Sequence, residues 1–144
     1  METTDKKAIA ESFSHLLALL HQKFIQPVAF PLPPNHFGTL ICLGNYGTQT
    51  ITELSSRLKI SKQQMSPIID RLYKSGYISR EKDNQDRRNV NITMTAEGFA
   101  LLFDHHKKIV QLFEAKLMNL TDQAELAELA KSELTLQRLI TKFF

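Results

Sequence analysis

Positive charge is concentrated in the middle of the chain, where it could bind a polyanion such as nucleic acid. Residues 50–95 hold nine lysines and arginines against five acidic residues, a net charge of +4. Residues 1–49 are neutral and residues 96–144 carry −1, so the net charge of the whole chain, +3, comes from this middle segment alone. A solvated surface could have the same composition, so the interpretation depends on the elements that carry these charges.

Two capping boxes mark the start of two short helices inside this segment. Residues 50–53 fit the pattern T-x-x-E and residues 61–64 fit S-x-x-Q. In each box the first hydroxyl can accept the amide of the last residue, whose side chain reaches back to the first amide. The boxes predict helices over about 51–58 and 62–75. The linker between them is very short, so the helices must cross sharply, as in a helix-turn-helix.

The helix expected at 62–75 has an apolar face and a polar face. Met65, Ile68, Ile69 and Leu72 share one side at 100° per residue and should pack on the preceding helix. The other side could be ordinary solvent surface, but glutamine, serine and arginine can also read base edges or hold phosphates. The side chains in question are Lys62, Gln63, Gln64, Ser66, Arg71 and Lys74.

Two residues of this helix fit the interpretation poorly. Pro67 lies beyond the first turn, removes one backbone donor and predicts a local bend. Asp70 lies on the outward face, where DNA phosphates would repel it. Lys74, four residues further on, is the expected ion partner that neutralises it.

A β-hairpin is expected after this helix. Val90, Ile92 and Met94 alternate with polar residues, which is the period of a half-buried strand. The segment 82–88, which precedes that strand, is entirely polar and rich in turn formers, so it should form the tip of the hairpin. Arg80 adds a positive charge just before this tip.

The tip carries the sequence Asp86, Arg87, Arg88. Guanidinium groups match phosphate oxygens, so these arginines could enter a minor groove or clamp a DNA backbone. Asp86 makes sense as an internal partner that directs one of them. Taken alone, an Asp-Arg-Arg sequence is more often an ordinary charged turn.

Helices are expected on both sides of this segment. Residues 6–26 have apolar positions at helical spacing, and four prolines within 27–34 then interrupt the helix. A further helix should begin near Asn35 and end before one of the glycines that follow. Thr95 and Thr121 are expected to begin two more helices, which end near 117 and 141. The expected order is four helices, two strands and two helices.

The composition excludes several classes of protein. A single cysteine, Cys42, cannot build a disulfide framework, and its apolar neighbours indicate a buried structural thiol. No apolar run approaches the ~20 residues of a membrane span, and the polar N-terminus is unlike a signal peptide, so a cytoplasmic protein without a membrane partner is expected. Nucleotide-binding, zinc-protease and nucleophile-elbow motifs are absent, so neither an enzyme nor a cofactor is expected.

The middle of the chain resembles the MarR family of bacterial transcription regulators. The resembling pieces follow the family's order and spacing, and their most specific part is the Asp-Arg-Arg sequence followed by a strand and T-x-x-G. They are residues 51–58, 60–72, 74–80, 86–88 and 92–98.

The resemblance implies a mainly α fold with a small β-hairpin wing. In that fold the chain 1–144 forms a single domain, with a winged helix-turn-helix DNA-binding lobe at 35–95. Helices in the segments 5–26 and 96–144 pair two copies into an obligate homodimer.

The resemblance also implies the function of a ligand-responsive repressor of transcription. The homodimer would bind double-stranded DNA at a pseudo-palindromic operator with half-sites roughly 34 Å apart. The helix 62–75 would enter the major groove and the wing 82–89 an adjacent minor groove. The implied DNA-binding residues are Lys62, Gln63, Gln64, Ser66, Arg71, Lys74, Arg80, Asp86, Arg87 and Arg88.

The effector is left open among the types to which the family responds. A small phenolic or lipophilic ligand is favoured, in a pocket lined by residues such as His15, Phe37 and His106. Oxidant sensors of the family place their reactive cysteine nearer the first helix, which argues against Cys42 in that role.

Two alternatives remain within this fold. One is a zinc-type regulator, because the helices that bind zinc in such relatives carry His15, His36, Cys42, His105 and His106 here. Adjacent histidines on a helix point about 100° apart and seldom share one metal, so no metal site is expected. The other is a winged-helix protein-interaction module without a DNA target, which the presence of the wing arginines disfavours.

Overall fold

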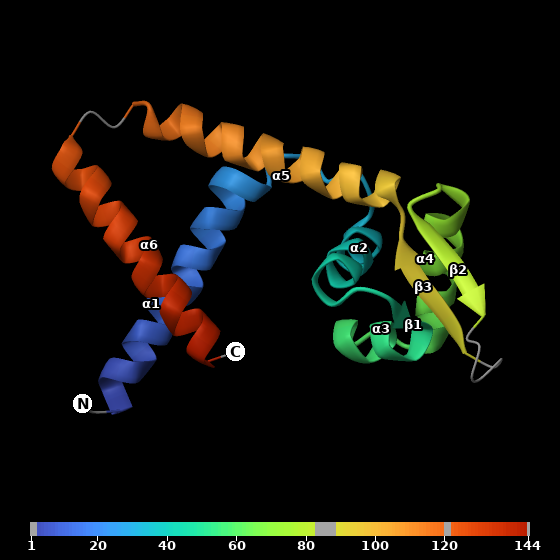
Figure 1. Cartoon of the computed structure of the whole chain (residues 1–144). Helices are drawn as coiled ribbons and strands as arrows, with labels where there is room; N and C mark the ends of the chain where they lie inside the picture. The colour runs from blue at the N-terminus through green and yellow to red at the C-terminus, as the bar shows by residue number, and fades with distance from the viewer. Residues whose placement is uncertain (1–2, 83–88, 120–121, 144) are drawn as a thin grey trace. The chain divides into compact units, whose positions relative to one another are not determined.

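The structure is a computed structural model of residues 1–144, and it describes all of them except 1–2, 83–88, 120–121 and 144 (Figure 1). The helices and strands follow in chain order: α1 (Thr3–Leu20), a π-helical turn (His21–Ile25), α2 (Pro34–Tyr46), β1 (Gln49–Thr50), α3 (Ile51–Leu58), α4 (Lys62–Lys74), β2 (Ile78–Lys82), β3 (Val90–Met94), α5 (Ala96–Leu117) and α6 (Gln123–Phe143). The expected helices and the strand pair are confirmed. The π-helical turn and β1 are additional elements that the sequence did not predict.

Both predicted capping boxes are present. Thr50 Oγ1 accepts the amide of Glu53 at 3.2 Å, and the Glu53 carboxylate accepts the amide of Thr50 at 2.7 Å. These hydrogen bonds from Thr50, the backbone bond first, hold the pKa of Glu53 below its usual range. Ser61 and Gln64 repeat the arrangement at the start of α4. Between the two helices Lys59 adopts φ 52°, a left-handed conformation that ends α3 and turns the chain sharply into α4.

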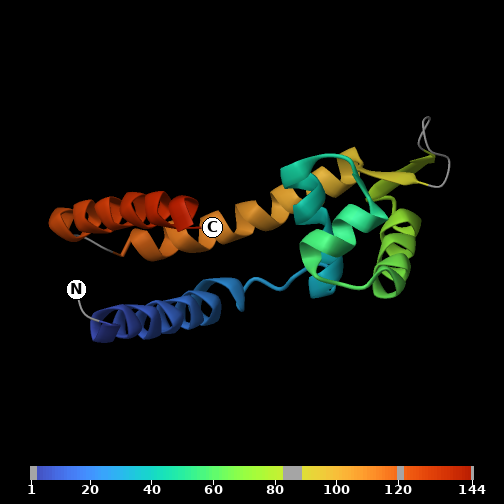
Figure 2. The ribbon, with the colours of Figure 1, turned by 90° about the horizontal axis from the view of Figure 1, so that it is seen from below.

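The sheet has three antiparallel strands in the order β1-β3-β2. Ile78 of β2 lies opposite Met94 of β3, and Lys82 lies opposite Val90 at the other end of the hairpin. The short strand β1 pairs with the side of β3 that faces away from β2, and Gln49 lies opposite Ile92. Two views at right angles show β2 running beside α4 (Figures 1 and 2).

We call the elements from α2 to β3 the winged lobe. Its core lies between three helices and the sheet, and the apolar face predicted for α4 is buried in it. The buried apolar side chains are Phe37, Leu40, Cys42, Leu43, Leu54, Met65, Ile68, Ile69, Leu72, Ile78, Ile92 and Met94.

The start of α5 is attached to the winged lobe by a tight backbone contact. The amide of Gly98 donates to Thr95 Oγ1 at 3.2 Å, which confirms Thr95 as the cap, and that hydroxyl donates to the carbonyl of Gly76 at 2.6 Å. A Cβ at position 98 would lie 2.4 Å from the carbonyl oxygen of Tyr77. Only glycine therefore fits the last position of T-x-x-G.

The outer helices α1 and α6 differ from the winged lobe in burial. None of their described side chains is buried, and large apolar ones such as Leu17 and Leu134 are 53% and 64% exposed. Residues 1–109 form one compact unit and residues 110–144 another. α6 begins at Gln123, and Asp122 caps it by accepting the amide of Ala124 at 2.8 Å. Thr121, which was expected to begin this helix, lies outside the described residues. None of the helices in the described ranges is long and apolar enough to cross a membrane.

Candidate nucleic-acid interface and ligand pocket

The outward face of α4 presents polar and basic side chains to solvent. Because the opposite face is locked into the core, the helix cannot rotate and the outward side chains keep their direction. The predicted residues Lys62, Gln63, Gln64, Ser66, Arg71 and Lys74 are all exposed. The helix therefore offers both hydrogen-bonding groups and positive charge on a rigid support.

The two neighbouring glutamines of this face differ in availability. Gln64 Oε1 accepts hydrogen bonds from the amide and the hydroxyl of Ser61, at 3.2 and 3.0 Å, because Gln64 closes the capping box. Gln63 makes no side-chain hydrogen bond to any described residue. Gln63 is therefore the better placed of the two to pair with a base. Ser66 donates its hydroxyl to the carbonyl of Lys62 at 3.1 Å.

The partner predicted for Asp70 is wrong. Asp70 Oδ1 accepts a hydrogen bond from Arg80 Nη2 of β2 at 2.5 Å, and Lys74 is not its ion partner. The Arg80 guanidinium carbon also lies 4.7 Å from the centre of the Tyr73 ring. A helix pair predicted from i, i+4 spacing is thus replaced by a contact between the helix and the neighbouring strand.

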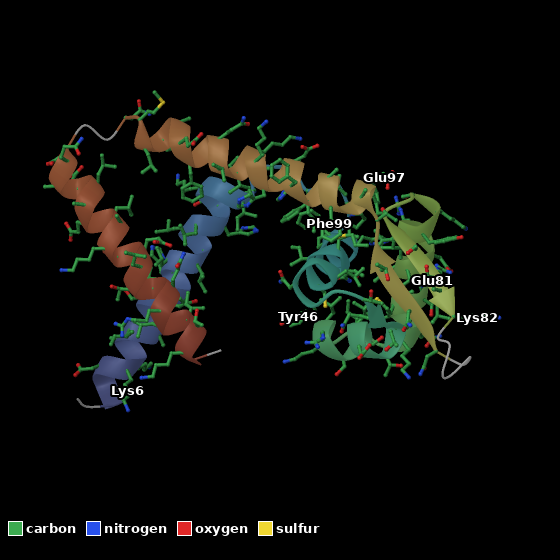
Figure 3. All side chains as sticks on the ribbon, in the orientation of Figure 1. Lys6, Tyr46, Glu81, Lys82, Glu97 and Phe99 are labelled. Carbon is green, nitrogen blue, oxygen red and sulfur yellow. The ribbon has the colours of Figure 1, made fainter. Side chains whose placement is uncertain are left out.

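The wing residues Asp86, Arg87 and Arg88 lie outside the described residues. The stem of the wing is described, and Figure 3 shows Glu81 and Lys82 at the end of β2 that is remote from the start of α5. Both side chains are exposed. Glu81 and Lys82, the last residues before the tip, therefore belong to the strand β2 that contacts α4.

A contact that the sequence did not suggest ties α3 to the end of α2. The Arg57 guanidinium carbon lies 3.9 Å from the centre of the Tyr46 ring, and Arg57 Nε donates to the buried Gln49 side chain at 2.9 Å. Arginine stacks on aromatic rings and forms directed hydrogen bonds, so this cluster fixes the orientation of α3. No sequence motif signals it, because the three residues belong to three different elements.

The largely apolar pocket in residues 1–109 has a volume of about 430 Å³. Two of the three predicted residues, Phe37 and His106, line it, whereas His15 lines a separate hollow on α1. The full lining is Ile25, Phe30, Phe37, Ile41, Gly44, Asn45, Leu102, His105, His106 and Ile109. Its size is within the range of small-molecule sites.

An aromatic cluster that the sequence did not predict forms one wall of the pocket. The ring of His105 stacks on Phe30, with centres 5.1 Å apart, and lies 4.6 Å from the centre of Phe37. His105 Nε2 is buried without a hydrogen-bond partner among the described residues. Burial, with Lys108 and His106 nearby, lowers the pKa of His105, so the imidazole favours its neutral form. The three rings therefore give this wall a flat and largely apolar surface.

The histidines and the cysteine do not gather into a metal site. Within the described part of the chain, no three His, Cys, Asp or Glu side chains come together to hold a metal ion. Cys42 is buried, as predicted, and its burial raises the pKa of the thiol. A raised pKa disfavours the reactive thiolate.

Two capped helices crossing sharply, with a β-hairpin beside the second, define a winged helix-turn-helix protein. Residues 32–90 match the model of the MarR family. An uncharacterized HTH-type transcriptional regulator of Bacillus subtilis, YsmB, is 30% identical over 130 residues, which cover 90% of this chain and 88% of that one. The HTH-type transcriptional repressor YetL of the same organism is 33% identical over 67 residues, which cover 44% and 40%. The chain belongs to the MarR family.

Solved structures agree with this fold. A MarR family protein from Bacillus stearothermophilus superposes with a TM-score of 0.73 at 20% identity, covering 98% of this chain and 99% of that one. The winged helix fold is therefore confirmed along the chain. The protein is an HTH transcriptional regulator of a family that binds DNA, typically as dimers, and it is not an enzyme.

Proposed function

We propose that the protein is a cytoplasmic repressor that binds a pseudo-palindromic operator as a homodimer and releases it when a small ligand binds. The observation that carries the DNA-binding part is the outward face of α4, which is polar, basic and held rigid by a buried apolar face. The name of the relative YetL supports the assignment as a repressor.

In this proposal α4 enters the major groove. Gln63 pairs with a base edge, preferably adenine, and Ser66 and Arg71 contact neighbouring positions. Lys62 and Lys74, at the two ends of the helix, bind phosphates. Gln64 acts mainly by capping the helix, so that free amides of the first turn face the backbone of DNA.

The wing is proposed to bind an adjacent minor groove. Arg87 and Arg88 would insert into that groove or bind a backbone phosphate, and Asp86 would orient one of them. The +4 charge of residues 50–95 supports this role, because positive charge attracts the phosphates of DNA.

Two copies are proposed to pair through helices in the segments 5–26 and 96–144. The exposed apolar side chains of α1 and α6 support this, since apolar surface of that extent commonly marks an interface. Two-fold symmetry would then present two α4 helices to half-sites roughly 34 Å apart.

Selection of DNA from a random pool followed by binding at several salt concentrations tests the assignment. Affinity for the selected duplex should fall steeply with salt, as expected when phosphates are neutralised. Gln63→Ala should relax base preference at one position of each half-site. Lys62→Ala should weaken binding to all DNA sequences alike. It should also reduce the dependence of affinity on salt concentration by the amount expected for about one phosphate contact. Absence of any salt-dependent DNA binding would overturn the proposal.

The effector is proposed to be a small phenolic or lipophilic molecule in the pocket beside Phe37 and His106. The pocket supports it by its volume and by its aromatic wall of Phe30, Phe37 and His105. The proposed effector can be disproved without affecting the proposed DNA binding.

A pocket-filling variant tests the effector. Ile41 lines the pocket and is 43% exposed, so Ile41→Trp should fill it without disturbing the core. A panel of substituted phenols should raise the melting temperature of the wild type and release its DNA, and should do neither with the variant. Phe99→Trp, an exposed aromatic substitution outside the pocket, is the control.

A further inference from the structure

We propose that Arg80 is a positioning residue, which fixes the wing strand β2 against the recognition helix α4 so that both reach one DNA site together. The proposal rests on the DNA-binding function proposed above. It assigns to Arg80 and Asp70 an internal task in place of direct contact with DNA.

The alternation of β2 directs the Arg80 side chain over α4. Ile78 is buried in the core beneath the helix, and Arg80, two residues further along the strand, lies on the same face. Its side chain is only 29% exposed, although a side chain as long as arginine's could extend into solvent. The strand therefore delivers this side chain to the helix.

Two residues of α4 hold the guanidinium in different directions. Asp70 accepts its Nη2 hydrogen bond at 2.5 Å, and the Tyr73 ring lies beneath it, 4.7 Å from ring centre to Cζ. Residues three apart are neighbours on a helix surface, so the acid and the ring form one receptor. A planar group bound at its edge and stacked on its face keeps a defined orientation.

The charge of Asp70 supports an orienting role. Asp70 is 58% exposed on the face proposed to approach DNA, where a carboxylate repels phosphates. Exposed ion pairs contribute little to folding stability, so stability alone is a weak reason for an acid at this place. Holding Arg80, and through it the wing strand, gives the acid a function that outweighs its repulsion.

A pair of charge-matched variants gives the sharpest test. Asp70→Asn and Glu81→Gln each remove one negative charge, and the exposed Glu81 side chain on β2 (Figure 3) forms no ion pair with Arg80 in the described structure. If Arg80 positions the wing, Asp70→Asn weakens binding to the selected duplex about tenfold, whereas Glu81→Gln leaves it unchanged or slightly tighter. If charge alone matters, both variants bind more tightly, which would overturn the proposal.

Conservative variants of Arg80 and Tyr73 separate positioning from direct phosphate contact. Arg80→Lys keeps the positive charge but loses the planar guanidinium. If Arg80 acts by positioning, this variant should lose about tenfold in affinity for the selected duplex, as Asp70→Asn does. The double variant should be no weaker than Arg80→Lys alone, because both changes break one contact. Tyr73→Phe, which keeps the ring, should bind like the wild type. An Arg80→Lys protein with wild-type affinity would overturn the proposal.

Two further readouts distinguish positioning from a general structural role. The affinity for a duplex of unrelated sequence and the melting temperature should stay at wild-type values in Asp70→Asn, so that only the ratio of specific to unspecific binding falls. A parallel loss of both affinities with a lower melting temperature would overturn positioning. A wild-type chain that binds no DNA would overturn the proposed function itself, which is a separate outcome.

Discussion

The winged lobe and the outer helices α1 and α6 bury their apolar residues very differently. All twelve buried apolar side chains among the described residues lie between Phe37 and Met94. The described side chains of α1 and α6 are at most half-buried, although both helices carry leucines and isoleucines at helical spacing. The lobe therefore has its own core, whereas the outer helices must obtain their stability from whatever covers their apolar faces.

This difference assigns different physical tasks to the two regions. A lobe with a closed core can hold polar side chains in fixed directions, which sequence reading of DNA requires. Helices with open apolar faces suit assembly, since their burial can be completed by a second copy. Four perturbations should distinguish the two regions.

Truncation of the lobe core should have the largest effect. Leu72 of α4 is fully buried, so Leu72→Ala should lower the free energy of unfolding by about 3 kcal/mol. Met118→Ala, at a side chain that is 83% exposed, should cost less than about 0.5 kcal/mol. Urea denaturation at one fixed protomer concentration measures both. Equal costs would mean that the lobe does not hold the main core.

A charge on the outer helices should act on association. Leu134 of α6 is 64% exposed, and Leu134→Glu should weaken self-association at least tenfold, about 1.4 kcal/mol, because a carboxylate resists burial in an apolar interface. Sedimentation equilibrium measures the change, and Glu133→Gln, at the exposed neighbouring position, is the control. Unchanged association in Leu134→Glu would remove α6 from the proposed interface.

Removal of a helix cap should destabilise the whole fold when the cap lies in the winged lobe, but only the end of the helix when the cap lies at α6. Ser61→Ala should lower the unfolding free energy by about 1 kcal/mol, because the cap belongs to the cooperative lobe. Asp122→Ala removes the cap of α6 and should speed amide exchange in its first turn while the lobe unfolds as before. Hydrogen exchange of both helices decides between these patterns.

Acid should destabilise the fold through two histidines, one in α2 of the winged lobe and one in α5. Burial, with Arg71 nearby, lowers the pKa of His36 below the usual 6.5, and burial also lowers that of His105. The unfolded chain then takes up protons first, so stability is greatest above pH 6.5 and declines as the pH falls from 6.5 to the lowered pKa values. Thermal unfolding between pH 7.5 and pH 5 is the measurement. His105→Gln should flatten this dependence, whereas His21→Gln, at an exposed position, should leave it unchanged.

Local patterns in the sequence predicted the elements of the lobe well. The capping boxes, the apolar face of α4 and the alternation of β3 are each set by interactions within a few residues, so spacing alone reveals them. The strand β1 was not predicted, because two residues carry no period and Gln49–Thr50 forms a strand only by pairing with β3. The π-helical turn after α1 likewise leaves no mark in the spacing of apolar residues.

The candidate site was predicted by residue type more fully than by contact. Phe37 and His106 were placed at a pocket that both line, but Phe30 and His105 were missed because their stacking joins a proline-rich connection to a later helix. Gln64 was assigned both to the cap and to DNA, and the hydrogen bonds of its Oε1 favour the cap. Spacing of four residues indicated Lys74 as the partner of Asp70, whereas the strand supplied Arg80.

The sequence by itself determined where α3, α4 and α5 begin, which face of α4 is buried, and that the positive charge belongs to residues 50–95, since each depends on neighbours along the chain. The tertiary structure decided which side chains meet across elements: Arg80 with Asp70 and Tyr73, Arg57 with Tyr46, and His105 with Phe30. The physical reason is that these contacts depend on how the helices and the sheet pack together. That packing is set by the whole core, and no short stretch of sequence encodes it.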